Sequence, residues 1–251
     1  PIRSTYLIDH ADFVSCSQQS YVDKYDLLAG IKPGGTFLLN TMWDMAGLEK
    51  NLPAFMKRTI AEKHIRFFTI DAVDIAKEIG LGNRTNMILQ SAFFRLANII
   101  PLEQAVKHLK DSVADTYGKK GDNVVAMNCA AIDRGISDLT EIAVPPSWFN
   151  AADEVKATPN ADAPDYIRNF LMPINRMEGD SIPVSGLLPV EDGSYPTGTA
   201  AYEKRGVAIY VPHWNADRCL QCNQCSIVCP HACIRPVLTT AAETAAAPAG
   251  F

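Results

Sequence analysis

Thr36-Phe-Leu-Leu-Asn40 is the stretch that decides the fold, because this apolar run predicts a buried strand. A similar run, Arg66-Phe-Phe-Thr-Ile70, follows a helical pattern that begins at Pro53 and extends to about Lys63. A helix between two strands returns the chain to the edge from which it started, so the strands pair in parallel. The sequence therefore predicts an α/β fold in which a parallel sheet is flanked by helices.

The same alternation extends in both directions along the chain. Upstream, Asp12-Phe-Val-Ser-Cys16 predicts another strand, the pattern over Tyr21–Leu28 predicts a helix, and Pro33-Gly-Gly35 separates that helix from the next strand. Downstream, Asp71 is suited to cap a helix that stops at Gly80. The first half of the chain is therefore expected to form one α/β domain.

The rest of the chain falls into segments of different composition. From Asn83 to about Ile136 the pattern is helical throughout. Residues 144–200 are rich in proline and predict a linking region, after which Val207-Ala-Ile-Tyr-Val211 predicts one more strand. We expect an α/β domain, a small Pro-rich linking domain and a cysteine-rich segment, over residues 1–145, 146–212 and 213–251.

Composition limits the possible functions. The 251 residues are 47% hydrophobic and 20% charged, as in an ordinary globular protein. A net charge of −5, with no basic run, argues against nucleic acid as a partner. The apolar stretches are too short for a membrane span, and no export signal is visible. We therefore expect a cytoplasmic protein; the first residue, Pro1 rather than Met, suggests a processed product or a fragment.

The cysteines predict a metal site. Five of the seven lie between residues 219 and 233, where clustering with two-residue gaps indicates ligation in a reducing compartment rather than disulfides. The run Cys219-Leu-Gln-Cys222-Asn-Gln-Cys225-Ser-Ile-Val-Cys229-Pro230 is the iron–sulfur pattern C-x2-C-x2-C-x3-C-P. The fourth cysteine of this pattern usually ligates the other cluster in two-cluster ferredoxins.

Zinc is the alternative for these cysteines. Zinc sites typically pair two C-x2-C units across a longer loop, and the uninterrupted run that ends in Cys-Pro fits an iron–sulfur cluster better. Cys233 could be a spare ligand, although a small buried thiol is the favoured interpretation. Cys16, after a predicted strand, has no adjacent base and is interpreted as a core thiol.

Several segments resemble one enzyme family. Glu203-Lys-Arg205, the run Val211-Pro-His-Trp-Asn215 and the cysteine run continuing to Pro236 are similar to pyruvate:ferredoxin (flavodoxin) oxidoreductase. Upstream, Lys32–Asn40 and Gly82-Asn-Arg-Thr-Asn86 resemble the gamma-type domain of that family, where coenzyme A is engaged. The resemblance covers essentially all of the chain and is most specific over residues 182–236.

The resemblance implies a reaction and its cofactors. The family decarboxylates a 2-oxoacid on thiamine diphosphate, passes electrons through three 4Fe-4S clusters to ferredoxin or flavodoxin, and releases the acyl group as acyl-CoA. For pyruvate the products are acetyl-CoA and CO2, and the full enzyme is expected to be a homodimer. This chain lacks the Gly-Asp-Gly and paired Asn that hold thiamine diphosphate and Mg2+, since Asp192-Gly193 stands alone. The thiamine site is therefore expected on other domains or subunits.

The resemblance also assigns the ligands. Cys219, Cys222 and Cys225 would ligate one cluster, and Cys229 its neighbour, with the partner cysteines beyond Phe251. The last part would then be the first half of a two-cluster ferredoxin-like domain. The family usually has a small residue in place of Cys233, so this thiol is a departure.

Three residues are candidates for contact with coenzyme A. Such ligands favour the carboxyl ends of parallel strands and the N-termini of helices, where free N–H groups meet phosphates. Asn40 and Thr41 follow a predicted strand, and Arg84 adds a positive charge before a helix. The alternative is that Asn40 and Thr41 only form a turn and that Arg84 is a solvated residue at the helix start.

Three hypotheses remain from the sequence. The leading one is an internal fragment of a thiamine-dependent pyruvate:ferredoxin oxidoreductase, inactive alone, whose catalytic residues lie elsewhere. The second is an autonomous electron carrier with one 4Fe-4S cluster. The third is an interaction protein stabilised by zinc.

Overall fold

The computed structural model describes residues 8, 10–153, 161–203, 208 and 211–247. The chain divides into two compact units, Pro1–Val207 and Ala208–Phe251, and each is described by itself. The predicted strand over Val207–Val211 lies largely outside the described residues. None of the described helices is both long enough and apolar enough to cross a membrane.

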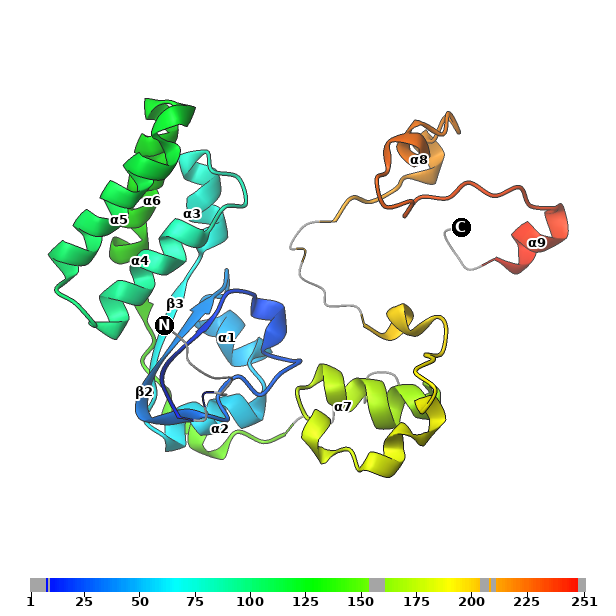
Figure 1. Ribbon diagram of the computed structural model, residues 1–251, viewed down its shortest axis with the longest axis horizontal. Helices are drawn as coiled ribbons and strands as arrows, with labels where there is room; N and C mark the ends of the chain where they lie inside the picture. Colours follow the sequence, from blue (N-terminus) through cyan, green and yellow to red (C-terminus); the bar gives the residue numbers. More distant parts are fainter. Residues whose placement is uncertain (1–7, 9, 154–160, 204–207, 209–210, 248–251) are drawn as a thin grey trace. The chain divides into compact units, whose positions relative to one another are not determined.

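A four-stranded sheet organises the first unit (Figure 1). Its strands are β1 (Ala11–Cys16), β2 (Ile31–Asn40), β3 (Arg66–Ile70) and β4 (Thr140–Glu141), in that order across the sheet. The first three pair in parallel, and β4 pairs with β3 antiparallel. The α/β prediction is confirmed, but the sheet is mixed rather than wholly parallel, because a two-residue edge strand leaves no apolar pattern in the sequence.

Helices follow the strands as the periodicity predicts. Six α-helices belong to the described part of this domain: α1 (Met45–Asn51), α2 (Ala54–Glu62), α3 (Ala72–Ile79), α4 (Asn86–Ala97), α5 (Leu102–Tyr117) and α6 (Asp122–Ser137). The Asp71 carboxylate caps α3 by accepting from the Asp74 N–H at 3.0 Å, and Gly80 ends that helix in the left-handed region.

Two local predictions before β2 are wrong. Tyr21–Leu28 forms no α-helix; a short 3-10 turn, η1 (Gln19–Tyr21), is followed by a loop. Both Val22 and Leu28 are fully buried from that loop, and the Asp26 side chain accepts from the Leu28 N–H, which favours a turn over a helix. The apolar spacing was therefore a signal of burial and not of helix.

Pro33-Gly-Gly35 lies inside β2 rather than before it. Ala11 pairs with Ile31 but Phe13 pairs with Thr36, so the extra residues form an irregularity in the strand. Gly34 has a φ of 73°, and a Cβ on Gly35 would lie 2.9 Å from the Lys32 carbonyl oxygen. Glycine is required here because the bulge brings the backbone close to itself.

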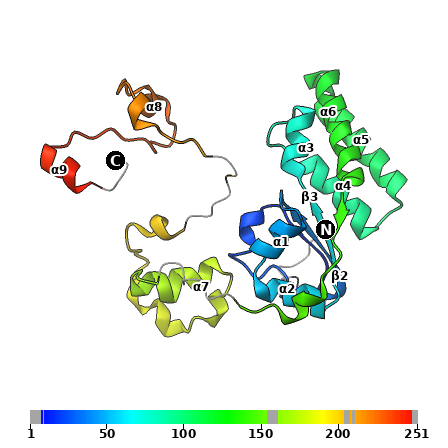
Figure 2. The same ribbon diagram turned by 180° about the vertical axis from the view of Figure 1, so that it is seen from behind.

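Strand alternation divides the core between the two faces of the sheet. Phe37 and Phe67 face α1, α2 and the 3-10 helix η3 (Pro146–Asn150), which contributes the fully buried Trp148. Leu38 and Phe68 face α3, α4 and α6. Figures 1 and 2 show α3–α6 gathered apart from α1 and α2. The sheet is thus covered on both faces, as a parallel arrangement requires.

One glycine permits the closest helix contact of the domain. A Cβ on Gly135 in α6 would lie 2.3 Å from the Ile88 carbonyl oxygen and 2.2 Å from the Ser91 Oγ, both in α4. The Ser91 hydroxyl is buried and donates to the Ile88 carbonyl. The two helix backbones therefore approach at a distance that only glycine allows.

Residues 161–203 form short helical pieces. These are the π-helix η4 (Ile167–Leu171), α7 (Met172–Asn175) and the 3-10 segments Gly179–Ser181, Val184–Val190 and Thr199–Tyr202. Frequent prolines keep the elements short, and a small core forms around Ala163, Ile167 and Leu171.

The second unit contains η8 (Ala216–Arg218), α8 (Gln224–Val228) and α9 (Ala241–Ala246). A Thr240–Glu243 capping box begins α9, with each side chain bonded to the backbone of the other residue. Most described side chains of this unit are exposed, including large apolar ones.

Candidate functional site

The cysteine run curls around a short helix. Cys225 lies in α8, with Cys219 and Cys222 before it, and Cys229 directly after its last residue. All four are free thiols; the first three are exposed and Cys229 is partly buried. Thiols that are near one another in sequence, unpaired and accessible are suited to bind a soft metal centre.

Left-handed backbone at three positions turns the chain of this segment. The φ angles are 53° at Gln221, 60° at Asn223 and 50° at Ala232. A non-glycine residue seldom adopts this conformation, and its occurrence marks constrained, often functional, sites. Here the consequence is that backbone N–H groups meet thiol sulfurs.

Two backbone N–H groups in this segment donate to cysteine sulfurs. The Gln221 N–H donates to the Cys219 Sγ at 3.4 Å, and the Cys233 N–H donates to the Cys229 Sγ at 3.2 Å. Backbone N–H groups of His231, Cys233 and Ile234, in that order of effect, lower the pKa of the Cys229 thiol. These contacts therefore favour the thiolate of Cys229, which is the form that ligates a metal.

The donor set fits an iron–sulfur cluster. Among the described residues no three His, Cys, Asp or Glu side chains converge on a single ion. Ligands of a cubane cluster do not converge in this way, because each thiolate binds a different iron atom. Four thiols, two of which accept a hydrogen bond from a backbone N–H at the sulfur, match the soft ligands and hydrogen bonds that such clusters use.

The two other cysteine interpretations have different outcomes. Cys233 is exposed, so its interpretation as a buried thiol is wrong; its backbone N–H, rather than its thiol, contacts the rest of the cysteine run, at the Cys229 Sγ. Cys16 is a core thiol as expected: it is 4% exposed, and its Sγ donates to the Gln18 carbonyl. Burial raises the pKa of Cys16, so the group stays an unreactive thiol.

Asn40 and Thr41 lie at the carboxyl end of β2, and both are buried. The Asn40 amide donates to the Ser17 carbonyl at 3.0 Å and accepts from the Ala72 N–H at 2.9 Å. Thr41 donates through its hydroxyl to the Gln19 Oε1 at 2.8 Å. These side chains fix the loop after β1 and the start of α3 against the strand end.

A pocket of about 360 Å³ opens at this edge of the sheet. Thr41 lines it, but Asn40 and Arg84 do not, so the structure does not gather the three candidates around one cavity. Five carboxylates and one cation also line it: Asp44, Asp71, Asp74, Glu78, Asp138 and Arg134. A larger pocket, of about 440 Å³, lies between α1, α2 and η3 and contains none of the candidates.

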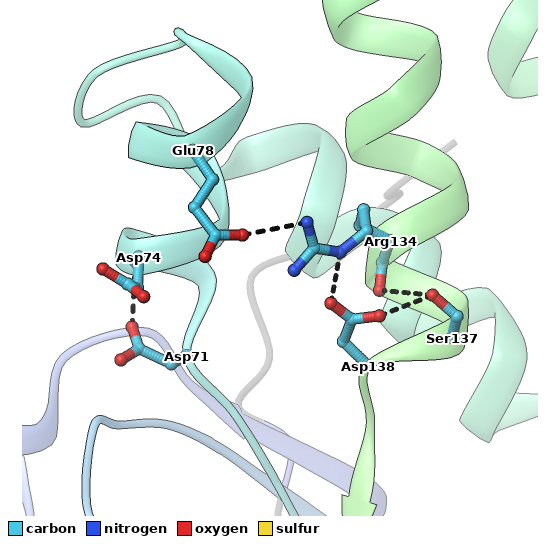
Figure 3. A network of polar contacts seen from close by, with 6 residues as sticks. All are labelled: Asp71, Asp74, Glu78, Arg134, Ser137 and Asp138. Carbon is cyan, nitrogen blue, oxygen red and sulfur yellow. Dashed lines mark hydrogen bonds and ion pairs between the residues drawn. The ribbon is translucent and has the colours of Figure 1, made fainter.

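Arg134 organises the acidic side of the smaller pocket (Figure 3). Its guanidinium donates to Glu78 of α3 at 3.0 Å and, through Nε, to Asp138 just beyond α6. Burial acts to raise the pKa of Asp138, but hydrogen bonds from Ser137 and Arg134 outweigh it and hold that pKa below its ordinary value. This ion-pair network was not predicted. Arg134 and Asp138 have the i,i+4 spacing that could have revealed one half of it.

Arg84 lies elsewhere, in the turn between α3 and α4, and is exposed. Its N–H donates to the Leu81 carbonyl, and the helix that follows begins at Asn86 without a side-chain cap at Thr85. Arg84 therefore comes just before a helix N-terminus whose N–H groups lack a capping side chain, which is a suitable position in the chain for phosphate contact.

Together, the fold and the cysteine run define an α/β domain followed in sequence by a segment with the cysteine pattern of iron–sulfur proteins. Residues 1–137 match the pyruvate ferredoxin/flavodoxin oxidoreductase family, 152–208 match a domain of unknown function, and 211–234 match a 4Fe-4S binding domain. The chain belongs to the pyruvate ferredoxin/flavodoxin oxidoreductase family. The family resemblance predicted from the Glu-Lys-Arg and cysteine motifs is thereby confirmed.

Curated relatives match over the whole chain. It is 57% identical to the pyruvate-flavodoxin oxidoreductase of Enterobacter agglomerans and 54% identical to the pyruvate:ferredoxin oxidoreductase of Moorella thermoacetica, over 100% of its length in both cases. The chain spans 21% of the length of each relative. A solved structure, the PORC subunit of pyruvate oxidoreductase from Thermotoga maritima, is 18% identical with a TM-score of 0.41, over 53% of this chain and 66% of that one, too slight a likeness to support an argument.

Proposed function

We propose that this chain supplies electron-transfer ligands and the coenzyme A side of an enzyme that oxidises pyruvate to acetyl-CoA and CO2 with ferredoxin or flavodoxin as acceptor. One observation carries the proposal: the four thiols of the C-x2-C-x2-C-x3-C-P run are free, and they lie within the segment that matches a 4Fe-4S binding domain. The full enzyme would hold thiamine diphosphate and Mg2+ on other parts, act as a homodimer and work in the cytoplasm.

The ligands are proposed to serve two clusters. Cys219, Cys222 and Cys225 would bind one 4Fe-4S cluster, and Cys229 would bind its neighbour. When bound, such a cluster accepts and releases one electron at a time. The N–H groups directed at Cys219 and Cys229 support the assignment, because each stabilises negative charge on a ligating sulfur.

Coenzyme A is proposed to contact the α/β domain through Arg84, with Asn40 and Thr41 shaping the carboxyl end of β2. Arg84 supports phosphate contact because this exposed cation comes just before the uncapped start of α4. Five carboxylates line the pocket beside Thr41, and they oppose a phosphate there. The phosphate groups are therefore assigned to Arg84, and the Asn40 and Thr41 side chains are assigned to holding the loops in place.

Anaerobic reconstitution of the chain, followed by iron, sulfide and zinc analysis, tests the cluster assignment. Labile iron below about four atoms per chain is expected, because Cys219, Cys222 and Cys225 would lack the fourth thiolate of their cluster. A stable set of about four iron and four sulfide would favour the autonomous one-cluster carrier. One zinc without sulfide would overturn both cluster readings.

A steady-state kinetic experiment tests the coenzyme A assignment separately. In the protein that carries this chain, Arg84→Ala should raise the KM for coenzyme A about tenfold, the cost of one charge-assisted hydrogen bond, and leave the KM for pyruvate unchanged. Arg84→Lys keeps the charge and should recover part of the loss. Unchanged coenzyme A kinetics in Arg84→Ala would contradict the assignment.

A further inference from the structure

We infer that Ala232 is a positioning residue for the sulfur of Cys229, and that its left-handed backbone raises the reduction potential of the cluster that Cys229 ligates. The inference rests on the proposed function. It concerns the segment 229–234, in which the chain leaves the cysteine run, turns, and passes back over the last thiol.

The geometry begins at the proline. Pro230 has no N–H, so the first backbone donor after Cys229 is His231. Ala232 then adopts a φ of 50°, and the next residue, Cys233, donates its N–H to the Cys229 Sγ at 3.2 Å.

A backbone N–H that follows the left-handed residue thus donates to the Cys229 sulfur. Successive N–H groups that a left-handed residue turns to one side form an anion-binding concavity, and a thiolate is an anion of suitable size. Cys219 receives a similar contact, from the Gln221 N–H at 3.4 Å. Both ends of the cysteine run therefore have one backbone donor, and at Cys229 the donor comes directly after the left-handed Ala232.

The conformation of Ala232 costs stability. A residue with a Cβ loses roughly 1–2 kcal/mol in the left-handed region. The Ala232 side chain is exposed, and no packing of that methyl group accounts for the conformation. What the turn achieves is the approach of the Cys233 N–H to the Cys229 sulfur, so we assign the strain to that approach.

Hydrogen bonds to a ligating sulfur stabilise the reduced cluster, because reduction adds negative charge that the donors offset. A residue that cannot adopt a left-handed φ should withdraw at least the Cys233 N–H. One charge-assisted bond lost corresponds to about a tenfold change in the one-electron reduction equilibrium, or about 59 mV.

The test replaces Ala232 in the protein that carries this chain and measures cluster midpoint potentials by redox titration followed by electron paramagnetic resonance. Ala232→Val should lower the potential of one cluster by about 59 mV, because β-branched residues avoid the left-handed region. Ala232→Gly and Ala232→Asn both tolerate that region and should keep the wild-type potential. Asn is as bulky as Val, so the pair separates backbone conformation from side-chain size.

Four outcomes would overturn the inference. An unchanged potential in Ala232→Val would show that residue 232 does not set the donors, and equal shifts in Val and Asn would show a side-chain effect. If the wild-type protein carries iron and sulfide, a shift of the midpoint potential in Ala232→Gly equal to that in Ala232→Val would also contradict the inference. Absence of any 4Fe-4S signal from wild type would overturn the proposed function as well, which distinguishes the two failures.

Ser226→Ala is the control. It removes a hydrogen bond to the Ile234 carbonyl in the same segment without a sulfur contact, and its midpoint potentials should match those of the wild type.

Discussion

The α/β domain and the cysteine segment are stabilised in different ways. In the domain, alternate residues of β2 and β3 are buried on both faces of the sheet, and the largest side chains are fully enclosed. In the cysteine segment Leu220 is 89% exposed and Ile227 is 80% exposed. The domain therefore owes its structure to burial of its own apolar surface, whereas we expect the segment to depend on what its thiols bind.

Hydrogen exchange should give the largest contrast between the two regions. Amides of residues 219–234 are expected to exchange almost without protection in protein stripped of clusters, and to slow by roughly two orders of magnitude or more once clusters are assembled, since ligation contributes folding free energy. Amides of β2 and β3 should be protected equally in both forms. Equal protection of the segment in both forms would contradict the comparison.

Gly135 offers the next largest effect, confined to the domain. Gly135→Ala should lower the free energy of unfolding by about 1–3 kcal/mol, because the new Cβ would collide with the Ile88 carbonyl and the Ser91 hydroxyl. Urea unfolding followed by tryptophan fluorescence measures it. Gly118→Ala is the matched control: nothing lies within 4 Å of its Cβ position, and its effect should be about 0.5 kcal/mol or less. Similar losses in both variants would argue against close packing of α4 and α6.

Lys63 tests a smaller contribution to the same domain. Its ammonium donates to the carbonyl oxygens of Leu28, Ala29 and Ile31, at 3.3, 3.3 and 3.0 Å, and so ties the end of α2 to the loop before β2. Lys63→Met keeps the length of the side chain and should cost about 1–2 kcal/mol in the same unfolding experiment. Lys107→Met, at an exposed position of α5, should leave the midpoint unchanged. An unchanged free energy of unfolding in Lys63→Met would show that water replaces these contacts fully.

Asp138 should give the smallest effect, with a defined pH dependence. Its pKa is lower in the folded chain, so the unfolded chain binds its proton first as the pH falls. The stabilisation is present above the ordinary aspartate pKa, near 4, and is lost as the pH falls through the folded value. Because both partners are partly exposed, Asp138→Asn should cost less than about 1 kcal/mol at pH 7. This loss of unfolding free energy should vanish in acid, and a loss that stays the same at every pH would contradict the ion-pair explanation.

The sequence predicted those parts of the fold that a local pattern encodes. The strands over Thr36–Asn40 and Arg66–Ile70 were recognised from apolar runs, and α3 from its cap and final glycine. The two-residue β4 carries no pattern, and its place is set by pairing with β3. The prediction of a helix over Tyr21–Leu28 was wrong because buried residues in a loop can have the same spacing as the apolar residues of a helix.

The candidate site divides in the same way. The candidate thiol ligands are visible in the sequence because the cysteine run is local, and their assignment to clusters stays a prediction. The left-handed φ at Ala232 could not be predicted, since alanine seldom adopts it and only the turn toward Cys229 requires it. The pairing of Glu78 with Arg134 joins helices far apart in sequence, so it depends on tertiary structure.

The central claim is that the cysteine run serves two clusters and not one. Electron paramagnetic resonance of the reduced protein that carries this chain, comparing Cys222→Ser with Cys229→Ser, tests it most directly. We predict that the two variants perturb different cluster signals, each leaving the signal affected by the other variant in place. Perturbation of the same single signal by both variants would contradict the account and would assign all four thiols to one cluster.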